Sequence, residues 1–450
     1  MCQHILASQI HPYLPIELWD DILKRTDPIT CLAFCRLDLA LEFGESSALL
    51  PYSVVASGYL AGTQLLCQSG RAEIRDAKLF ETACKHGHLR IVCWLHENGY
   101  EYEGCTTTPM DIVDSLYPNY KFNTIPWLHS ESYKEAAMNL HGSKSYKEAA
   151  MDLAAKKGHL HVVRWLHDNR SDGCYKMAMD LAAGNGHLDV VRWLHENRTE
   201  GCTTLAMDHA AGDGHLDVVR WLHENRSEGC TTLAMDYAAR DGHLDVVRFL
   251  HENRTEGCTI WTMNLAARHG HLDIVRFLHE NRPEGCATDA MDFAAEDGHL
   301  DVIRWLHENR TEGCTTLAMD SATYGGHLEI VCWLHENRSE GCTTLAMDYA
   351  AGNGHLDVVR WLHENRSEGC TTRAMDSAAR HGHLDVVRWL HENRSEGCTT
   401  QAMDSAAWGG HLDVVRWLHE NRSEGCTTQA MDSAAGKHPA VVRFLEKHIR

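Results

Sequence analysis

A repeat of 28 residues dominates the sequence. The tripeptide Gly-His-Leu begins at Gly158 and returns at every twenty-eighth position up to Gly410. An earlier copy begins at Gly87, and a degenerate copy with Trp127-Leu128-His129 lies between the two; at His438, His-Pro-Ala replaces Gly-His-Leu. We count about a dozen units. A fixed period over most of a chain indicates an array of similar structural units rather than several ordinary domains.

One unit, residues 231–258, contains two helical patterns. In the first pattern, three residues have the spacing of one buried helix face: Met235, Ala238 and Ala239. Thr231 and Thr232 are candidates for the N-cap of this helix, and Gly242 suits a left-handed residue at its C-terminal end.

The second pattern runs from about His243 to Asn253. Leu244, Val247 and Leu250 mark its buried face, with Val246 and Phe249 beside it. Helices this short cannot bury their apolar faces alone, so we expect the pairs to stack. The predicted fold is an all-α helical-repeat solenoid over residues 76–450, whose last unit is a cap.

The repeat resembles the ankyrin repeat. The residues that carry the resemblance are YAARDGHLDVVRFLHENRTEG, residues 237–257, and the corresponding residues of the other units. Two features depart from the family: Leu233-Ala234-Met235-Asp236 replaces Thr-Pro-Leu-His, and the period is 28 instead of about 33. The resemblance implies a protein-binding function, and the short period implies that the hairpin fingers of ankyrins are shortened or absent. We therefore look to the helical face for binding.

The charge balance restricts the partners. Lys and Arg number 42 and Asp and Glu 63, a net charge of −21, which is unfavourable for binding phosphate backbones or anionic lipid. No apolar run is long enough to cross a bilayer, and no secretory signal is visible at the N-terminus. With 18 Cys and no signal, we expect free thiols in the cytoplasm, or alternatively the nucleus, and a monomer without nucleic-acid or membrane partners.

Three residue types recur at the same position in successive units. We call such a set of equivalent positions a column, and these columns could be mistaken for metal-binding or catalytic residues. Of the 33 His, 11 lie in the Gly-His-Leu column and 12 in the Trp-Leu-His column, and Cys and Asp form further columns. A residue that recurs once per unit is most simply a structural residue of that unit. We expect the Asp column, for example Asp236, to link units by hydrogen bonds, and the Cys column to be a small buried hydrophobe. The sequence therefore predicts no metal, no cofactor and no catalytic site.

The positions that vary between units are the candidate binding site. In one unit they are Leu233, Tyr237 and the pair Arg240-Asp241 just before Gly-His. The i, i+4, i+8 spacing of Leu233, Tyr237 and Asp241 places these three on one face of the first helix. Other units place large side chains in these columns: Trp261, Phe293, Tyr324, Tyr349 and Trp408. Clustered exposed aromatic residues are typical of protein-binding hot spots, so we predict a site centred on residues 233–349. The alternative is relaxed drift on a solvated face, with some aromatics packing between units.

Residues 1–45 lie outside the period and resemble an F-box, in a stretch that includes Leu14-Pro15, Glu17-Leu18 and Ile22-Leu23. The resemblance implies docking onto a Skp-type adaptor of a cullin ubiquitin ligase. The contact residues would be Leu14, Pro15, Leu18, Ile22 and Leu23. The alternative is a helical cap that seals the first repeat. Residues 46–75 are predicted to be a connector with partial helix.

Three functions follow from these features. The first is an adaptor that recruits a target protein to a ubiquitin ligase, with the target on the repeat face. The second is a plain ankyrin-repeat scaffold or host-interaction protein whose N-terminal helices only cap the stack. The third, an enzyme, lacks a catalytic constellation outside the repeat.

Overall fold

The computed structural model describes residues 50–68, 77–100, 150–170 and 174–448. The chain divides into an N-terminal part, Met1–Cys230, and a C-terminal part, Thr231–Arg450. Each part is a stack of helix pairs, and the described residues of both contain helices and no strand. The F-box-like segment, with its candidate residues Leu14 to Leu23, lies outside the described residues.

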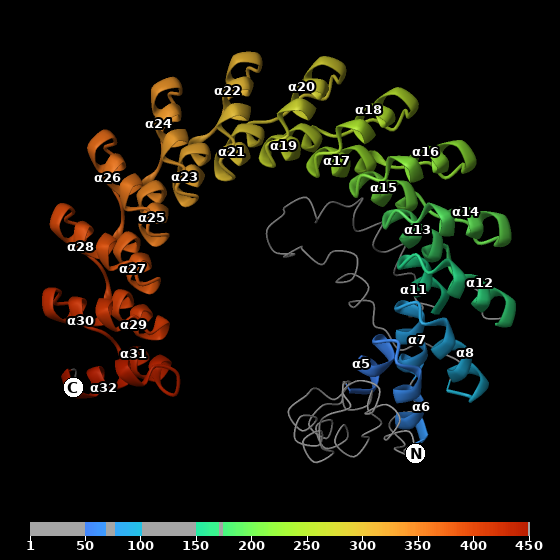
Figure 1. The fold of residues 1–450 in the computed structure, drawn as a ribbon. Coiled ribbons are helices and arrows are strands. Elements are labelled where there is room, and N and C mark those ends of the chain that lie inside the picture. Colours follow the sequence, from blue (N-terminus) through green and yellow to red (C-terminus); the bar gives the residue numbers. More distant parts are fainter. Residues whose placement is uncertain (1–49, 69–76, 101–149, 171–173, 449–450) are drawn as a thin grey trace, which may run out of the picture. The chain divides into compact units, whose positions relative to one another are not determined.

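The N-terminal part has five described helix pairs. In each pair the first helix has the odd number (Figure 1). The pairs are α5 (Leu50–Ala56) with α6 (Leu60–Gln68), α7 (Ala77–Lys85) with α8 (Leu89–Glu97), α11 (Ala150–Lys156) with α12 (Leu160–Asn169), α13 (Lys176–Gly184) with α14 (Leu188–Asn197), and α15 (Leu205–Gly212) with α16 (Leu216–Asn225).

The C-terminal part has eight described pairs. They are α17 (Thr232–Arg240) with α18 (Leu244–Asn253), α19 (Ile260–Arg268) with α20 (Leu272–Asn281), α21 (Asp289–Glu296) with α22 (Leu300–Asn309), α23 (Thr316–Tyr324) with α24 (Leu328–Asn337), α25 (Thr344–Gly352) with α26 (Leu356–Asn365), α27 (Thr372–Arg380) with α28 (Leu384–Asn393), α29 (Thr400–Gly409) with α30 (Leu412–Asn421), and α31 (Thr428–Ala434) with α32 (Pro439–His448).

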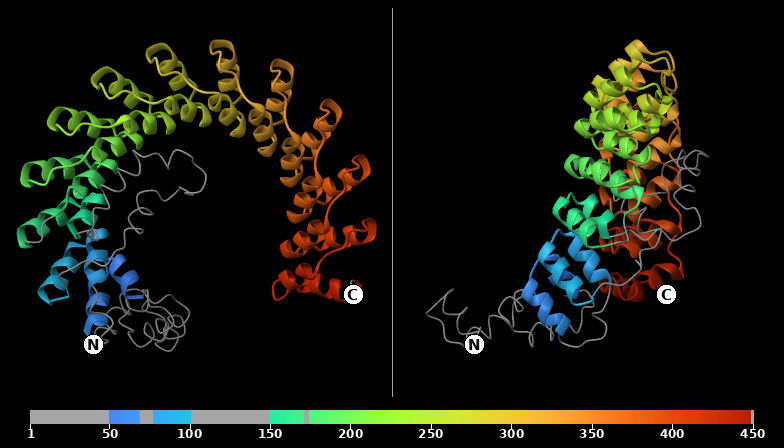
Figure 2. Two further views of the ribbon diagram at one scale, coloured as in Figure 1. Left: turned by 180° about the vertical axis from the view of Figure 1, so that it is seen from behind. Right: turned by 90° about the vertical axis from the view of Figure 1, so that its right-hand side faces the viewer.

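The first helices of the C-terminal part pack side by side in one row, and the second helices form another row with fewer contacts between neighbours (Figures 1 and 2). The close packing of the first row follows from its small residues. Ala238 and Ala239 in α17 are completely buried, as is the same alanine pair in α19, α21, α25, α27 and α29. Small side chains let neighbouring helix backbones approach, so this row is the core of the stack.

The predicted helix signals are confirmed, with one correction. Thr231 is the N-cap of α17, and its hydroxyl accepts a hydrogen bond from the Leu233 N–H. Gly242 has φ of +87°. In α18 the completely buried pair is Val246 and Val247, with Leu250 beside it, whereas Leu244 is only half-buried. Leu244 is the first residue of the helix, where its side chain reaches the edge of the core rather than its centre.

The segment predicted as a connector contains a further helix pair. Helix α5 packs on α7, and α6 contacts α8, as in the other units. The Nε2–H of His88 donates a hydrogen bond to the Ala56 carbonyl, 2.8 Å away, which is the link that Gly-His-Leu histidines make elsewhere. The sequence signal was Ser57-Gly58-Tyr59-Leu60, in which Tyr replaces His.

The unit α7–α8 stacks directly on the unit α11–α12. Helix α7 packs on α11, and the Nε2–H of His159 donates to the Lys85 carbonyl over 3.1 Å. The degenerate copy with Trp127-Leu128-His129, which the sequence places between these units, lies outside the described residues. Residues 101–149 are an insertion between α8 and α11, and they lie outside the described residues.

Candidate functional site

The Asp column links each unit to the next, as predicted. Asp348 in α25 accepts hydrogen bonds from the Thr371 N–H (2.8 Å) and the Thr371 hydroxyl (2.7 Å). Asp292 in α21 makes the same two bonds to Thr315. The Thr in turn caps the next first helix, so one carboxylate fixes the junction between two units. We call this arrangement the Asp–Thr clamp.

Burial perturbs the clamp carboxylates. It raises the pKa of Asp180 in α13 to about 6, although the N–H and hydroxyl of Thr203 oppose the rise by stabilising the anion. Burial likewise raises the pKa of Asp292 and Asp320. A raised carboxyl pKa can signal catalysis. Here the group is enclosed and both oxygens are bonded to the neighbouring unit, so the perturbation belongs to the scaffold.

One junction shows what the clamp requires. Asn264 replaces the Asp in α19, and Ala287 replaces its Thr. The Asn264 side-chain oxygen still accepts from the Ala287 N–H over 3.0 Å. The Asn264 amide nitrogen is buried without a hydrogen-bond partner among the described residues, because the hydroxyl is missing. The two substitutions together keep the backbone bond and lose the second bond.

The histidine columns are also structural. The Nε2–H of His271 donates to the Arg240 carbonyl of the preceding unit over 3.0 Å and so satisfies a helix C-terminus. In the other column, the Nη1–H of Arg366 donates to Nδ1 of His335 over 3.3 Å, and the His335 ring meets Trp361 edge-on at 5.2 Å. In the described residues no three His, Cys, Asp or Glu side chains gather as metal ligands would.

The Cys column behaves as a small apolar residue in the loops. Most of its members are buried, and Cys258, Cys286 and Cys426 are partly exposed. Burial raises the pKa of Cys342 to about 11 and that of Cys370 to about 12, so these thiols stay protonated and unreactive near neutral pH.

With these columns assigned, the variable positions of the first helices remain. We call their open side in the C-terminal part the first-helix face. In α17, α19 and α21 the aromatic side chains of these columns are largely covered, although Ile260 at the start of α19 is 44% exposed. Tyr237 is only 6% exposed, with the Arg240 guanidinium 4.9 Å from its ring centre. Our expectation that Tyr237 is an exposed contact is therefore corrected. In the next helix the same column holds Leu265, which is also buried.

The other predicted residues of α17–α21 are half-buried or paired. Leu233, Trp261 and Phe293 are half-buried, and Asp241 is exposed but forms a salt bridge with Arg240. Arg268 lies 5.1 Å from the Phe293 ring centre and forms salt bridges with Glu296 (3.2 Å) and Asp297 (3.3 Å). In α17–α21 the arginines therefore contact both the aromatic rings and the nearby carboxylates.

The face is open in α23 and α25. Tyr324 is 54% exposed and Tyr349 38%, and their rings meet edge-on with centres 5.7 Å apart. Tyr349 occupies the column of Tyr237, but its column neighbours are Ser321 and Ser377, which are too small to cover it. Leu317, one residue after the start of α23, is 53% exposed. Leu317 lies in the same variable column as Leu233, but it was not among the predicted contacts.

The open region continues through α27 and α29. Trp408 is 52% exposed, and the Arg380 guanidinium lies 5.5 Å from its ring centre. Arg373 and Arg380, both exposed, project from α27, which packs between α25 and α29. We missed both arginines as site residues because the sequence prediction centred the site on residues 233–349. Their signal was their position in the same variable columns as Leu233 and Arg240.

Comparison with known families gives two matches. A model described as ankyrin repeats in many copies matches residues 151–195, 291–335, 347–391 and 375–419. A model described as ankyrin repeats in three copies matches residues 179–264 and 207–290. Together these matches cover more than half of the chain. The chain belongs to the ankyrin-repeat family. No curated protein gives a significant match.

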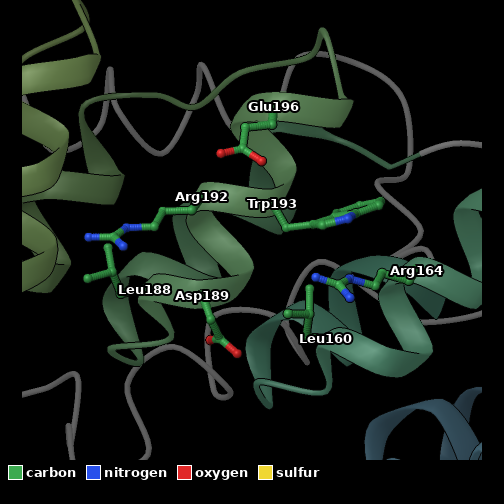
Figure 3. A pocket seen from close by; sticks show the side chains of 7 residues that line it. All are labelled: Leu160, Arg164, Leu188, Asp189, Arg192, Trp193 and Glu196. Carbon is green, nitrogen blue, oxygen red and sulfur yellow. The ribbon is translucent and has the colours of Figure 1, made fainter.

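The second helices of the ankyrin repeats offer a weaker candidate. A shallow hollow of about 460 Å³ lies between α12 and α14 (Figure 3). Arg164 and Leu160 line it from α12, and α14 contributes Leu188, Asp189, Arg192, Trp193 and Glu196. Most of these residues recur in α16, α26, α28 and α30, so they do not mark any single unit as a binding site.

Among the described residues, no helix of the ankyrin repeats is both long enough and apolar enough to cross a bilayer.

Proposed function

We propose that this ankyrin-repeat protein is a non-catalytic protein-binding scaffold whose target docks on the first-helix face of α23, α25, α27 and α29. The observation that carries the proposal is the cluster of exposed large apolar side chains on this face: Leu317, Tyr324, Tyr349 and Trp408. Leu233, Asp241, Trp261 and Phe293 extend the site toward α17 at lower exposure.

The physical argument is the cost of leaving such side chains in water. Burying apolar surface gains about 25 cal/mol per Å², and aromatic side chains at the centre of an interface dominate binding energies. Tyr324 and Tyr349 already hold each other in a fixed geometry. These two side chains therefore lose little conformational entropy when a partner binds.

The test is affinity capture with the intact chain and two triple variants. The first variant, L317S/Y324S/Y349S, changes the first-helix face. The matched control, R360S/R388S/R416S, changes exposed arginines of the second helices α26, α28 and α30. We expect the first to lose the proteins captured by the wild type and the second to keep them, with unchanged circular dichroism in both. Equal capture by the wild type and the first variant would refute the placement.

We also propose that residues 1–45 recruit the bound target to a cullin-type ubiquitin ligase through a Skp-type adaptor, which requires a cytoplasmic or nuclear location. The support is the sequence motif with Leu14, Pro15, Leu18, Ile22 and Leu23. The intact chain should co-purify with the adaptor, and L18D should abolish this association while leaving target capture intact. If the wild type shows no association, the segment only caps the stack and the protein is a plain scaffold.

A further inference from the structure

We propose that the first-helix face of α23–α29 binds an acidic segment of another protein that also carries aromatic or aliphatic side chains. This inference rests on the proposed function and specifies the chemistry of the partner. The segment would place its carboxylates on Arg373 and Arg380 and its apolar side chains against Tyr324, Tyr349 and Trp408.

The first step is the charge of the face. Each of the four first helices contains one carboxylate, the clamp Asp: Asp320, Asp348, Asp376 and Asp404. All four accept both hydrogen bonds from the Thr of the following unit, and three of them are buried. Engaged and mostly enclosed, these carboxylates contribute little negative charge to the surface. The face is therefore locally basic in a chain whose net charge is −21.

The second step is the state of the arginines. Arg373 and Arg380 are seven residues apart in α27, two turns along one helix face. Neither forms a salt bridge with any carboxylate in the described residues, although Arg240 and Arg268 in α17 and α19 do. A guanidinium binds a carboxylate with two parallel hydrogen bonds, and Arg380 is already positioned by the Trp408 ring. Both side chains are available to an incoming acid.

The third step is the arrangement of charge and apolar surface. Helix α27, with the two arginines, packs against α25 with Tyr349 on one side and α29 with Trp408 on the other (Figures 1 and 2). Neighbouring helices lie about 10 Å apart, so α23 to α29 spans roughly 30 Å. An extended segment rises about 3.3 Å per residue and would cover this distance with roughly nine residues. The expected order along the segment is apolar, acidic, apolar.

Other occupants fit less well. Single-stranded nucleic acid also favours arginines among aromatic rings, but a chain with 63 acidic and 42 basic residues opposes phosphate binding outside this small face. A second copy of the chain is acidic enough to bind, and the experiment separates this case.

The experiment begins with selection of random 12-residue peptides displayed on phage against the intact chain. We expect the enriched peptides to combine Asp or Glu with aromatic or aliphatic residues. One enriched peptide, labelled with a fluorophore, is then titrated by fluorescence anisotropy. The variant R373Q/R380Q should weaken binding about tenfold or more and reduce its dependence on salt. The matched variant R240Q/R268Q should leave both unchanged.

The outcomes separate the two proposals. Enriched peptides that are basic or uncharged, yet lose binding in Y324S/Y349S, would overturn the acidic partner and keep the protein-binding face. Peptides insensitive to Y324S/Y349S, or no enrichment at all, would overturn both. Displacement of the peptide by a single-stranded RNA oligonucleotide at equal concentration would assign the face to nucleic acid. A dimer detected by light scattering and dissociated by R373Q/R380Q would make the partner a second copy. Either of the last two results contradicts the proposal.

Discussion

Helices α17–α21 and α23–α29 have the same backbone plan but present different surfaces. Tyr237 and Tyr349 occupy the same column, yet one is 6% exposed and the other 38%. Tyr237 has an arginine over its ring and a leucine as its column neighbour, whereas Tyr349 lies between two serines. The comparison teaches that exposure in a repeat array is set by the side chains of the adjacent units and not by the column alone.

Charge follows the same division. In α17–α21 the arginines form salt bridges with Asp241, Glu296 and Asp297, so the positive charges on this face are neutralised by carboxylates of the same chain. In α23–α29 the column of Asp241 and Asp297 holds Gly, Asn or His, and the column of Glu296 holds no carboxylate. Arg373 and Arg380 form no salt bridge among the described residues. The arginines of α17–α21 are therefore already paired with carboxylates, whereas those of α27 are accessible to a partner.

The largest expected effect tests whether the two regions share one scaffold. Gly242 and Gly354 both have positive φ, and a Cβ atom at either would lie 2.7 Å or 2.6 Å from a histidine ring of the next unit. Because left-handed geometry costs about 1–2 kcal/mol and overpacking about 1–3 kcal/mol, G242A and G354A should each destabilise the fold by about 3–4 kcal/mol. Urea unfolding measures both. A difference of more than about 1 kcal/mol between them would show that the scaffolds differ.

The second effect concerns pH. The pKa of Asp180 is raised to about 6 in the folded chain, so the folded state binds this proton more tightly than the unfolded state does. The favourable contribution of the protonated group is complete below pH 4 and is lost as pH rises through 6. The free energy of unfolding of D180N, relative to wild type, should therefore rise by at most about 3 kcal/mol from pH 4 to pH 7.

Asp292 and Asp320 extend this test to the two compared regions, because burial raises the pKa of both. D292N and D320N should show the same direction of change with pH. A shift in the opposite direction in either variant, measured by urea unfolding at pH 4, 5, 6 and 7, would contradict the burial of that clamp.

The third effect exchanges the column neighbours. Leu265 is buried beside the column position of Tyr237, so L265S should destabilise the fold by about 2–3 kcal/mol and expose the ring. The reverse change, S377L, should cover Tyr349 with little loss of stability. Iodination of tyrosines, mapped by mass spectrometry, checks both. Unchanged labelling of Tyr237 and Tyr349 would show that the size of the column neighbour does not determine the exposure of the ring.

The smallest effect concerns the arginines. Arg380 makes only a cation–π contact in an exposed setting, so R380Q should cost about 0.5–1 kcal/mol or less. R240Q breaks a partly buried salt bridge and also removes the contact with the Tyr237 ring, so it should cost slightly more, about 1–2 kcal/mol. If R380Q destabilised the fold by several kcal/mol, Arg380 would be a structural residue and unavailable to a partner.

Much of the scaffold was predictable from the sequence. The 28-residue period and the hydrogen-bonding role of the Asp column follow from the recurrence of residues between units. The threonine N-cap and the positive-φ glycine follow from patterns within one unit. The helix pair at residues 50–68 and the insertion at 101–149 were harder, because the first lacks the histidine and the second retains fragments of the repeat. The burial of Tyr237 and the openness of Tyr349 depend on side chains 28 residues away, which single-unit patterns do not weigh.

Hydroxyl-radical footprinting with mass spectrometry tests the central claim most directly, with and without a peptide selected on the intact chain. The account predicts rapid oxidation of Tyr324, Tyr349 and Trp408 in the free chain and slow oxidation of Tyr237. With peptide bound, the three rapid sites should be protected and Tyr237 should not change. Oxidation of Tyr237 as fast as Tyr349, or protection confined to the second helices, would contradict the account.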